Sequence, residues 1–212
     1  PTTVRVMKND FFTRSAELIS LLGATPRVNV VITDVQTFSD DDFVAYGQAL
    51  DVLGTLVAES FLRGVHVSCN LLTDRMMLEQ MNNCGAGDES ITLSPEGKLY
   101  VCPAYYYDDD SNSIGCISKG GLNVKNSYLY TLKHAPICRH CDAWHCKRCI
   151  WLNQKTTREV NTPSHEQCVA SHIEREASRR LLAVLNNQGN FSFKSEIPKL
   201  DYNDPFDNRE TW

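Results

Sequence analysis

The sequence predicts an α/β fold in which an incomplete α/β domain is followed by a small, irregular α+β domain that holds metal ions or clusters. Up to residue 80, strand-like and helix-like segments alternate, whereas from Cys84 onward the segments are short and interrupted by glycine. Seven of the nine cysteines, all in this later part, follow a spacing typical of metal ligands. We therefore divide the chain into residues 1–80, residues 81–186 and an irregular tail over residues 187–212.

Composition and charge exclude several classes of function. A formal net charge of -5 and a pI near 5.7 argue against a nucleic-acid partner. The sequence has no run of apolar residues long enough for a membrane span, and its N-terminus lacks the basic and apolar stretches of a signal peptide. We expect a cytoplasmic protein, because cysteine patterns in a reducing compartment more often bind metal than form disulfides. Since the chain begins with Pro1 and not with methionine, we expect a processed protein or a piece of a longer one.

The first eighty residues predict a β-α-β unit. The β-branched run at residues 28–32 and the run at residues 65–69 are typical of buried parallel strands. Between them, Ser39 and Asp42 form a capping-box start for a long helix that Gly64 ends. Parallel strands need covered neighbours, so this part indicates the last section of a larger α/β domain.

Further elements are predicted on both sides of this unit. One helix is expected to start at Asn9 and to end at Gly23, and another is expected to start at Thr73. In the later part, the Pro and Gly of residues 94–97 predict a hairpin turn between two short strands. A long C-terminal helix is predicted over residues 164–185, where apolar residues recur at helical spacing.

The stretch C-R-H-C-D-A-W-H-C-K-R-C carries the most specific functional signal. A C-x2-C pair places two thiolates on one tight turn, where both can bind one metal ion or one cluster. Three cationic residues lie between these thiols and would offset the negative charge of a tetrathiolate site, namely Arg139, Lys147 and Arg148. A single zinc ion bound here would leave Cys84, Cys102 and Cys168 unexplained. The pattern favours iron–sulfur clusters, with zinc as the alternative.

The order of the cysteines resembles that of the SPASM domain, the C-terminal auxiliary-cluster module of radical SAM enzymes that modify peptides and proteins. That order is Cys84, then G-x4-C from Gly97 to Cys102, then C-x2-C-x4-C-x2-C at residues 138–149, then Cys168. The usual central motif of the family, C-x2-C-x5-C-x3-C, is one residue longer in both later gaps. The segments 71–75 and 81–84 also resemble maturases associated with CXXX-repeat peptides, and the whole resemblance covers about residues 25–186.

The resemblance implies a fold class and two ligand sets. The fold would be α/β, with the last βα units of a partial (β/α) barrel followed by a small irregular α+β domain that is SPASM-like. Two auxiliary [4Fe-4S] clusters would be bound, the first by Cys84, Cys102 and Cys149, and the second by Cys138, Cys141, Cys146 and Cys168. The first set lacks a fourth thiol, so its cluster would have an open iron or would take Cys116 or Cys69 as a ligand. Both of these cysteines have an alternative role as small apolar side chains in a core.

The same resemblance implies a function for a longer parent protein. It would be a radical SAM enzyme that modifies a ribosomally synthesised precursor peptide, with this chain as its C-terminal portion. Its auxiliary clusters would serve electron transfer or binding of the peptide. The C-x3-C-x2-C motif of the catalytic cluster is absent from this sequence, so S-adenosylmethionine would be bound by a missing N-terminal region, and no catalytic residue is assigned to this chain. The alternative is a zinc-stabilised module that binds a peptide or protein without catalysis.

The histidines and a tyrosine-rich segment are further candidates. Three histidines flank the cysteines and could be ligands, although we favour solvated loop positions for them; they are His134, His140 and His145. His165 and His172 lie two turns apart on the predicted C-terminal helix and are expected at its surface. The run of three tyrosines at residues 105–107 could meet a peptide, but we favour a strand end that leads into an exposed acidic loop at residues 108–110.

Overall fold

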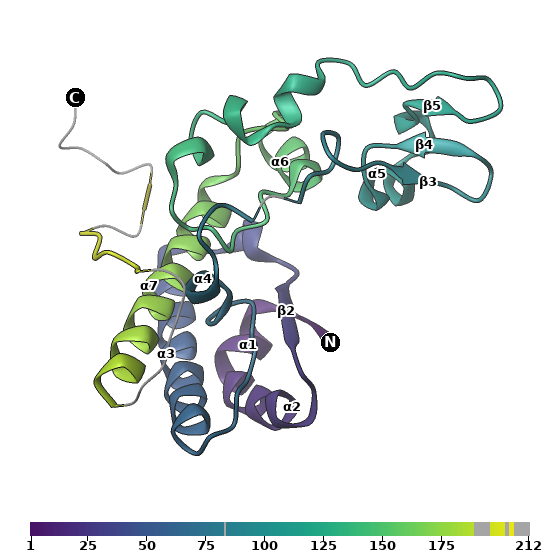
Figure 1. Ribbon diagram of the computed structural model, residues 1–212. Helices are drawn as coiled ribbons and strands as arrows, with labels where there is room; N and C mark the ends of the chain where they lie inside the picture. Colours follow the sequence, from purple (N-terminus) through teal and green to yellow (C-terminus); the bar gives the residue numbers. More distant parts are fainter. Residues whose placement is uncertain (83, 189–195, 202–203, 206–212) are drawn as a thin grey trace. The chain divides into compact units, whose positions relative to one another are not determined.

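The computed structural model describes residues 1–82, 84–188, 196–201 and 204–205. These residues form two compact units. Unit 1 comprises residues 1–82, 142–146 and the described residues from 165 onward, and unit 2 comprises residues 84–141 and 147–164 (Figure 1). Most of the predicted tail, residues 187–212, lies outside the described residues. None of the described helices is both long and apolar enough to cross a membrane.

Unit 1 contains a small parallel sheet. Strand β1 (Thr2–Val6) pairs with β2 (Val28–Ile32), with Thr2 opposite Val28 and Val6 opposite Ile32. The connection consists of α1 (Lys8–Arg14), a short 3-10 turn and α2 (Leu18–Ala24). The predicted strand at residues 28–32 is confirmed. β1 was not predicted, and the single helix expected from Asn9 is broken at Ser15, whose hydroxyl donates to the carbonyl of Ala49 at 3.2 Å.

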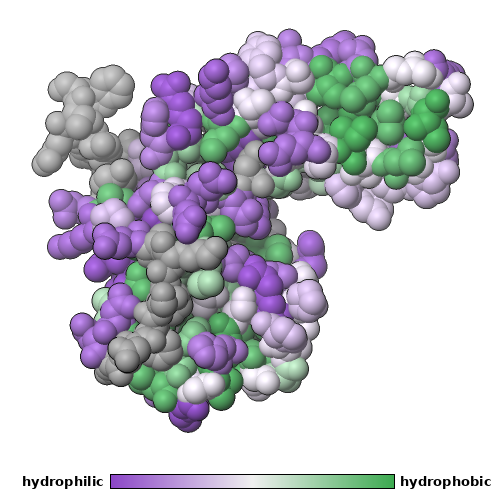
Figure 2. Space-filling model, in the orientation of Figure 1, coloured by the Kyte–Doolittle hydropathy of each residue, from purple (hydrophilic) through white to green (hydrophobic). Residues whose placement is uncertain are grey.

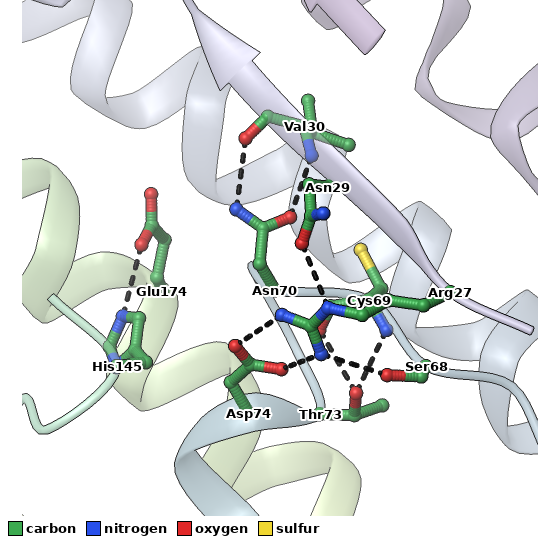
Figure 3. Close-up of polar contacts among 10 residues, drawn as sticks. All are labelled: Arg27, Asn29, Val30, Ser68, Cys69, Asn70, Thr73, Asp74, His145 and Glu174. Carbon is green, nitrogen blue, oxygen red and sulfur yellow. Dashed lines mark hydrogen bonds and ion pairs between the residues drawn. The ribbon is translucent and has the colours of Figure 1, made fainter. Parts of the chain in front are cut away.

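The strand predicted at residues 65–69 is wrong in its extent, because only Cys69 pairs with the sheet, through a parallel bridge to Val28. One residue later, the side chain of Asn70 takes the position of a strand backbone (Figure 3). Its Oδ1 accepts from the amide of Val30 at 2.7 Å, and its Nδ2 donates to the carbonyl of Val30 at 2.9 Å. A side-chain amide can replace the backbone in this way because it offers the same donor and acceptor. The main chain is therefore free to turn towards α4 (Asp74–Met77).

A partly buried ion pair ties the start of β2 to the start of α4. Arg27 donates to both carboxylate oxygens of Asp74, each at 2.7 Å, and also to Ser68 Oγ at 3.0 Å (Figure 3). A two-point contact of this kind fixes orientation as well as distance. Between these groups Cys69 is fully buried, and burial raises the pKa of its thiol to about 11. Its alternative role as a core residue is the one that the structure shows.

Two long helices form the core of unit 1. α3 (Asp40–Leu62) starts with the predicted capping box: Ser39 Oγ accepts from the Asp42 amide at 3.3 Å, and an Asp42 carboxylate oxygen accepts from the Ser39 amide at 2.8 Å. Gly64 follows its end with a φ of 79°. α7 (His165–Gln188) packs along α3 (Figure 1). Both helices bury apolar side chains in the same core, including Leu50, Leu53, Val57, Ile173, Ala177, Leu181 and Leu185.

Unit 2 is built around a three-stranded antiparallel sheet in the order β3 (Thr92–Leu93), β4 (Lys98–Tyr100) and β5 (Gly115–Cys116). The predicted hairpin is confirmed: the amide of Gly97 donates to the carbonyl of Ser94 at 3.0 Å, and Gly97 has the left-handed φ of 81° that the turn requires.

Helices and short turns complete unit 2. Its two helices are α5 (Pro103–Asp108) and α6 (Ile150–Thr157). The 3-10 turns are Asp110–Asn112, Ser127–Tyr130, Leu132–His134 and Cys138–His140. The tyrosines at residues 105–107 lie on α5, so the predicted strand end is wrong there, because Pro103 starts a helix. The acidic residues 108–110 are exposed, as predicted.

The described structure differs from the predicted domain division at two places, because residues 142–146 and α7 both belong to unit 1. α7, which the sequence analysis placed in the segment 81–186, belongs to unit 1. Within the described residues, the parallel sheet consists of β1, β2 and the bridged Cys69, and they form no barrel. The partial barrel and the SPASM-like fold stay predictions.

We predict that Asn70→Ala destabilises unit 1 by roughly 2–4 kcal/mol, because the buried amide and carbonyl of Val30 would lose their partners. Urea unfolding followed by circular dichroism measures this free energy. Asn9→Ala, at an exposed position of α1, is the matched control and should leave the unfolding midpoint unchanged. Equal midpoints for the two variants would contradict the role given to Asn70.

Candidate metal centre

Cys149 lies at the start of α6, where the backbone is held in an uncommon conformation. The preceding residue, Arg148, has a φ of 47°, and its guanidinium is 1% exposed and donates to the carbonyl of Tyr130. Burial raises the pKa of the Cys149 thiol; the amide of Leu152 opposes this shift, and charges on two other cysteines add to it. Those two are Cys102 and Cys84. Cys149 therefore lies within range of the charges of Cys102 and Cys84.

The other two thiols reach this place through the hairpin and a glycine turn. Cys102 follows the end of β4 and precedes Pro103, which starts α5. Cys84 precedes Gly85, whose carbonyl accepts from the amides of three following residues. Gly85 and Gly87 have φ values of 68° and 79°, which glycine adopts without steric cost. The sheet and this tight turn together bring Cys84 and Cys102 to one region.

Tyr130 contacts all three of the chain segments that carry these cysteines. Its ring packs against Gly87, where an added Cβ would lie 2.7 Å from the ring. The carbonyl of Tyr130 accepts a hydrogen bond from Arg148. The pKa of the Tyr130 hydroxyl is raised mainly by burial and also by the charge of Cys102. Tyr105 lies near Tyr130. Burial raises the pKa of its hydroxyl, and the charges of Tyr130, Cys102 and Cys149 raise it further. Tyr105 and Tyr130 therefore form an aromatic wall near Cys102, whereas Cys84 is exposed.

This first set fits a metal centre in its donor chemistry. Thiolates are the ligands of iron–sulfur clusters and of structural zinc. The buried cation of Arg148 lies next to Cys149 in the chain and can offset the charge of such a centre. As they stand, no three His, Cys, Asp or Glu side chains in the described part of the chain are arranged to hold a metal ion. Binding would require the three sulfurs to move closer together.

The two cysteines considered as a fourth ligand lie elsewhere. Cys116 lies in β5, half-buried, with its Sγ 3.1 Å from Ser118 Oγ, and hydrogen bonds with Ser118 lower its thiol pKa. Its expected role as a small buried apolar side chain is therefore wrong. Cys69 belongs to unit 1 and is fully buried there.

The second predicted ligand set is divided between the units. Cys138 and Cys141 belong to unit 2, and Cys146 and Cys168 belong to unit 1. Cys138 is buried on a 3-10 turn, and the other three are half-buried. The grouping of these four cysteines stays a prediction.

A charge network that the sequence analysis missed anchors residues 142–146 within unit 1. The carboxylate of Asp142 accepts two hydrogen bonds from Arg175, at 2.6 and 2.5 Å, and its carbonyl accepts one from Arg75 at 2.6 Å. Both arginines are 1% exposed. The guanidinium of Arg75 also stacks 3.9 Å from the ring centre of Trp144. Burial raises the pKa of Asp142, but the hydrogen bond and charge of Arg175 outweigh it and hold that pKa below its usual value.

The histidines fall into two groups. His134 and His140 are exposed, as predicted. His145 and His172 are each only 6% exposed, so the solvated and surface positions expected for them are wrong. Burial lowers the pKa of His172 to about 4. A sequence signal for the burial of His172 exists, since it lies three residues after Val169, a core residue of α7.

The comparisons with known proteins do not place this chain in a family. No family model matches it, and no curated protein is significantly similar to it. The candidate site therefore depends on its own residues and on the resemblance in cysteine order.

We predict that three thiols differ in their rate of alkylation near pH 8, because the thiolate is the reactive form. Cys116, with a lowered pKa, should react fastest, Cys149 more slowly, and Cys69, with a pKa of about 11, slowest. Isotope-coded alkylation followed by mass spectrometry measures the three rates. In denaturant the three rates should converge. If Cys69 reacted as fast as Cys116 in the folded chain, the assigned environments would be wrong.

We also predict that Gly87→Ala destabilises unit 2 by roughly 1–3 kcal/mol, because the new Cβ would collide with Tyr130 at a positive φ. Gly54→Ala is the matched control: Gly54 lies within α3 with no atom within 4 Å of an added Cβ. That change should stabilise the chain by about 0.5–1 kcal/mol, since alanine favours a helix. Thermal unfolding of both variants measures the difference, and a neutral Gly87→Ala would contradict the packing against Tyr130.

Proposed function

We propose that this chain is the C-terminal portion of a radical SAM enzyme that modifies a ribosomally synthesised peptide, and that it carries two auxiliary [4Fe-4S] clusters. The single observation that carries the proposal is the charge coupling of Cys149 with Cys102 and Cys84. These three cysteines are far apart in the sequence, and the resemblance groups the same three as one ligand set. We take the shared surroundings of these thiols as support for a common metal role, since thiolates are the ligands of such centres.

The residues around the first set have separate roles in this proposal. Cys84, Cys102 and Cys149 would hold the cluster, and the buried guanidinium of Arg148 would offset its negative charge. Tyr105 and Tyr130 would keep water away from it. When bound, such a cluster supplies electron transfer, or an iron that a substrate group can bind. In the described part of unit 2, Cys102 and Cys84 are the two cysteines whose charges shift the pKa of Cys149. A fourth ligand of this set is therefore not assigned.

The parallel sheet of unit 1 supports a larger parent domain. Parallel strands are normally covered on both edges, and β1 has one neighbour within the described residues, β2. In this proposal the rest of the parent enzyme adds further strands and supplies the region that binds and cleaves S-adenosylmethionine. The proposed location is the cytoplasm, where thiol ligands stay reduced.

A second candidate function, a zinc-stabilised module that binds a peptide or protein, is favoured by an apolar surface on unit 2. Figure 2 shows hydrophobic side chains gathered over the part of the molecule that Figure 1 labels β3, β4 and β5. Four apolar residues in this region are between 44% and 62% exposed, namely Ile91, Leu93, Ile117 and Leu122. Exposed apolar groups of this kind are typical of interaction sites. A peptide could bind them under either function.

Anaerobic reconstitution with iron and sulfide tests the proposal. We expect a brown protein with about eight iron atoms per chain, as two [4Fe-4S] clusters require. Cys149→Ala and Cys141→Ala should each remove about half of the iron, since they belong to different ligand sets. Ser118→Ala, at an exposed position of unit 2, should keep all of it. A colourless protein that binds zinc in place of iron would instead establish the second candidate.

A further inference from the structure

One face of the sheet of unit 2 carries a row of apolar side chains. In an antiparallel sheet, residues directly opposite each other point to the same face. Leu93 lies opposite Leu99, and Leu99 in turn lies opposite Gly115. An antiparallel bridge places Leu122 opposite Gly115 as well. Leu93, Leu99 and Leu122 therefore share one face of the sheet.

Two isoleucines extend the same face. Ile91 precedes Leu93 by two residues, and side chains two apart along a strand point to the same side. Ile117 follows Gly115 by two residues, and a Cβ added at Gly97 would lie 3.2 Å from Ile117 Cγ1. Together these side chains form what we call the open face: Ile91, Leu93, Leu99, Ile117 and Leu122. All of them except Leu99 are between 44% and 62% exposed, and exposed apolar groups gathered in this way are typical of interaction sites.

The opposite face of the sheet is already covered. Tyr100 and Lys98 point to that side, and both bind Asp110 in the 3-10 turn that follows α5. The hydroxyl of Tyr100 donates to Asp110 Oδ1 at 2.7 Å, and the ammonium group of Lys98 pairs with Oδ2. The ring of Tyr100 also packs edge-on against Tyr106 of α5, with the ring centres 5.4 Å apart. A partner of this sheet therefore has the open face to pack on.

The strand β3 lies at an edge of the sheet and presents backbone groups outward. The amide of Ser94 donates to the carbonyl of Lys98 at 2.8 Å, so these two residues form a hydrogen-bonded pair. Hydrogen-bonded and non-hydrogen-bonded pairs alternate along an antiparallel ladder. Leu93 and Leu99 therefore form a non-hydrogen-bonded pair, and the N–H and C=O of Leu93 point away from β4. An extended segment that binds these two groups would continue the sheet and place alternate side chains on the open face.

The charge around β3 is negative. Residues 88–96 contain three acidic side chains and no basic one. All three are exposed and lie before and after the strand, namely Asp88, Glu89 and Glu96. The basic residues of the sheet region have other places, since Lys98 pairs with Asp110 on the covered face and Lys119 follows β5 at the opposite edge. Charge complementarity therefore favours a segment with lysine or arginine near its ends.

The same charges disfavour a second copy of this chain as the occupant. If two β3 strands paired edge to edge in antiparallel order, Glu96 of one copy would approach Asp88 and Glu89 of the other. Like charges opposite each other destabilise a pair of strands, and charged residues are a common means of preventing such pairing. The negative ends of β3 thus separate a basic partner from self-association.

We propose that the open face and the edge of β3 bind an extended segment of a partner peptide, with apolar side chains at alternate positions and basic residues at its ends. This inference rests on the proposed function and deepens it, since it names the class of peptide that the enzyme would take. Because β3 is only two residues long, backbone pairing contributes little. Most of the affinity would come from apolar contact with the open face and from charge.

Binding of synthetic peptides to the full chain, measured by fluorescence anisotropy, tests the inference. The lysine probe is a fluorescein-labelled peptide that alternates valine and threonine and has lysine at both ends. We expect saturable binding that weakens as salt is added, because salt screens exposed charges. A probe with glutamate in place of lysine should not bind measurably. A lysine probe whose alternate amides are methylated should bind about tenfold more weakly, since it loses hydrogen bonds to the edge of β3.

Variants of exposed residues locate the binding surface. Leu93→Thr and Ile117→Thr should each weaken binding of the lysine probe by about three- to tenfold, because each removes apolar area from the open face. Val44→Thr is the matched control: Val44 is 62% exposed on α3, in the other unit, and its change should leave the affinity as it is. Glu96→Gln should reduce the salt dependence of binding, whereas Glu59→Gln, on α3, should keep it.

The outcomes separate the inference from the function on which it rests, because iron content is measured on the same protein. A chain that holds iron and sulfide but binds no probe, or binds the lysine and glutamate probes alike, overturns the inference and leaves the proposed function intact. Self-association that Leu93→Thr abolishes, seen by analytical ultracentrifugation, also overturns it, since the occupant is then a second copy. A chain that binds the lysine probe through Leu93 but holds zinc in place of iron supports the docking surface and assigns it to the second candidate function.

Discussion

The described structure of unit 1 depends on one residue, Asp142, which binds two buried arginines. Arg75 on α4 and Arg175 on α7 are both 1% exposed, and both bind this one residue. A guanidinium deprived of its partner in such a place costs about 3–5 kcal/mol, because a buried charge is left without compensation. The interaction therefore does more than join two helices. It also fixes the loop segment 142–146 within unit 1.

This loop segment, residues 142–146, is part of a stretch that looks like a single motif in the sequence. Residues 138–149 read as one dense group of cysteines, yet residues 142–146 belong to unit 1 and the residues on both sides belong to unit 2. The polar residues between the cysteines account for this division. Asp142, Trp144 and His145 each have a specific partner within unit 1, through charge, ring stacking and a hydrogen bond.

The sequence predicted those features that depend on neighbouring residues. The strand at residues 28–32 and the capping box at Ser39 follow from local pattern, and both are found. The strand expected at residues 65–69 is reduced to one bridge because the side chain of Asn70 replaces the backbone, and a hydropathy pattern cannot show that exchange. The grouping of Cys84, Cys102 and Cys149 came from resemblance and stays a prediction.

What the sequence could not show depends on distant partners. His145 is buried beside Glu174, which lies 29 residues later in the chain. Glu174 in turn accepts a hydrogen bond from Tyr46, which lies 128 residues before it. Tyr130 and Arg148 are not part of a recognisable sequence motif. Their contact with each other, and that of Tyr130 with Gly87, form only in the folded chain. Burial of a polar residue is decided by such long-range contacts, so it appears only when the tertiary structure is known.

The division into units has a consequence for how the protein is made. The chain passes from one unit to the other after Asn82, Cys141, Cys146 and Ser164. α3 therefore leaves the ribosome about a hundred residues before α7, the helix that covers its apolar side. At typical rates of synthesis this interval is on the order of ten seconds. During that time unit 2 and its thiols are synthesised, while the side of α3 that packs against α7 is still open to solvent and to chaperones. Unit 1 begins first and finishes last.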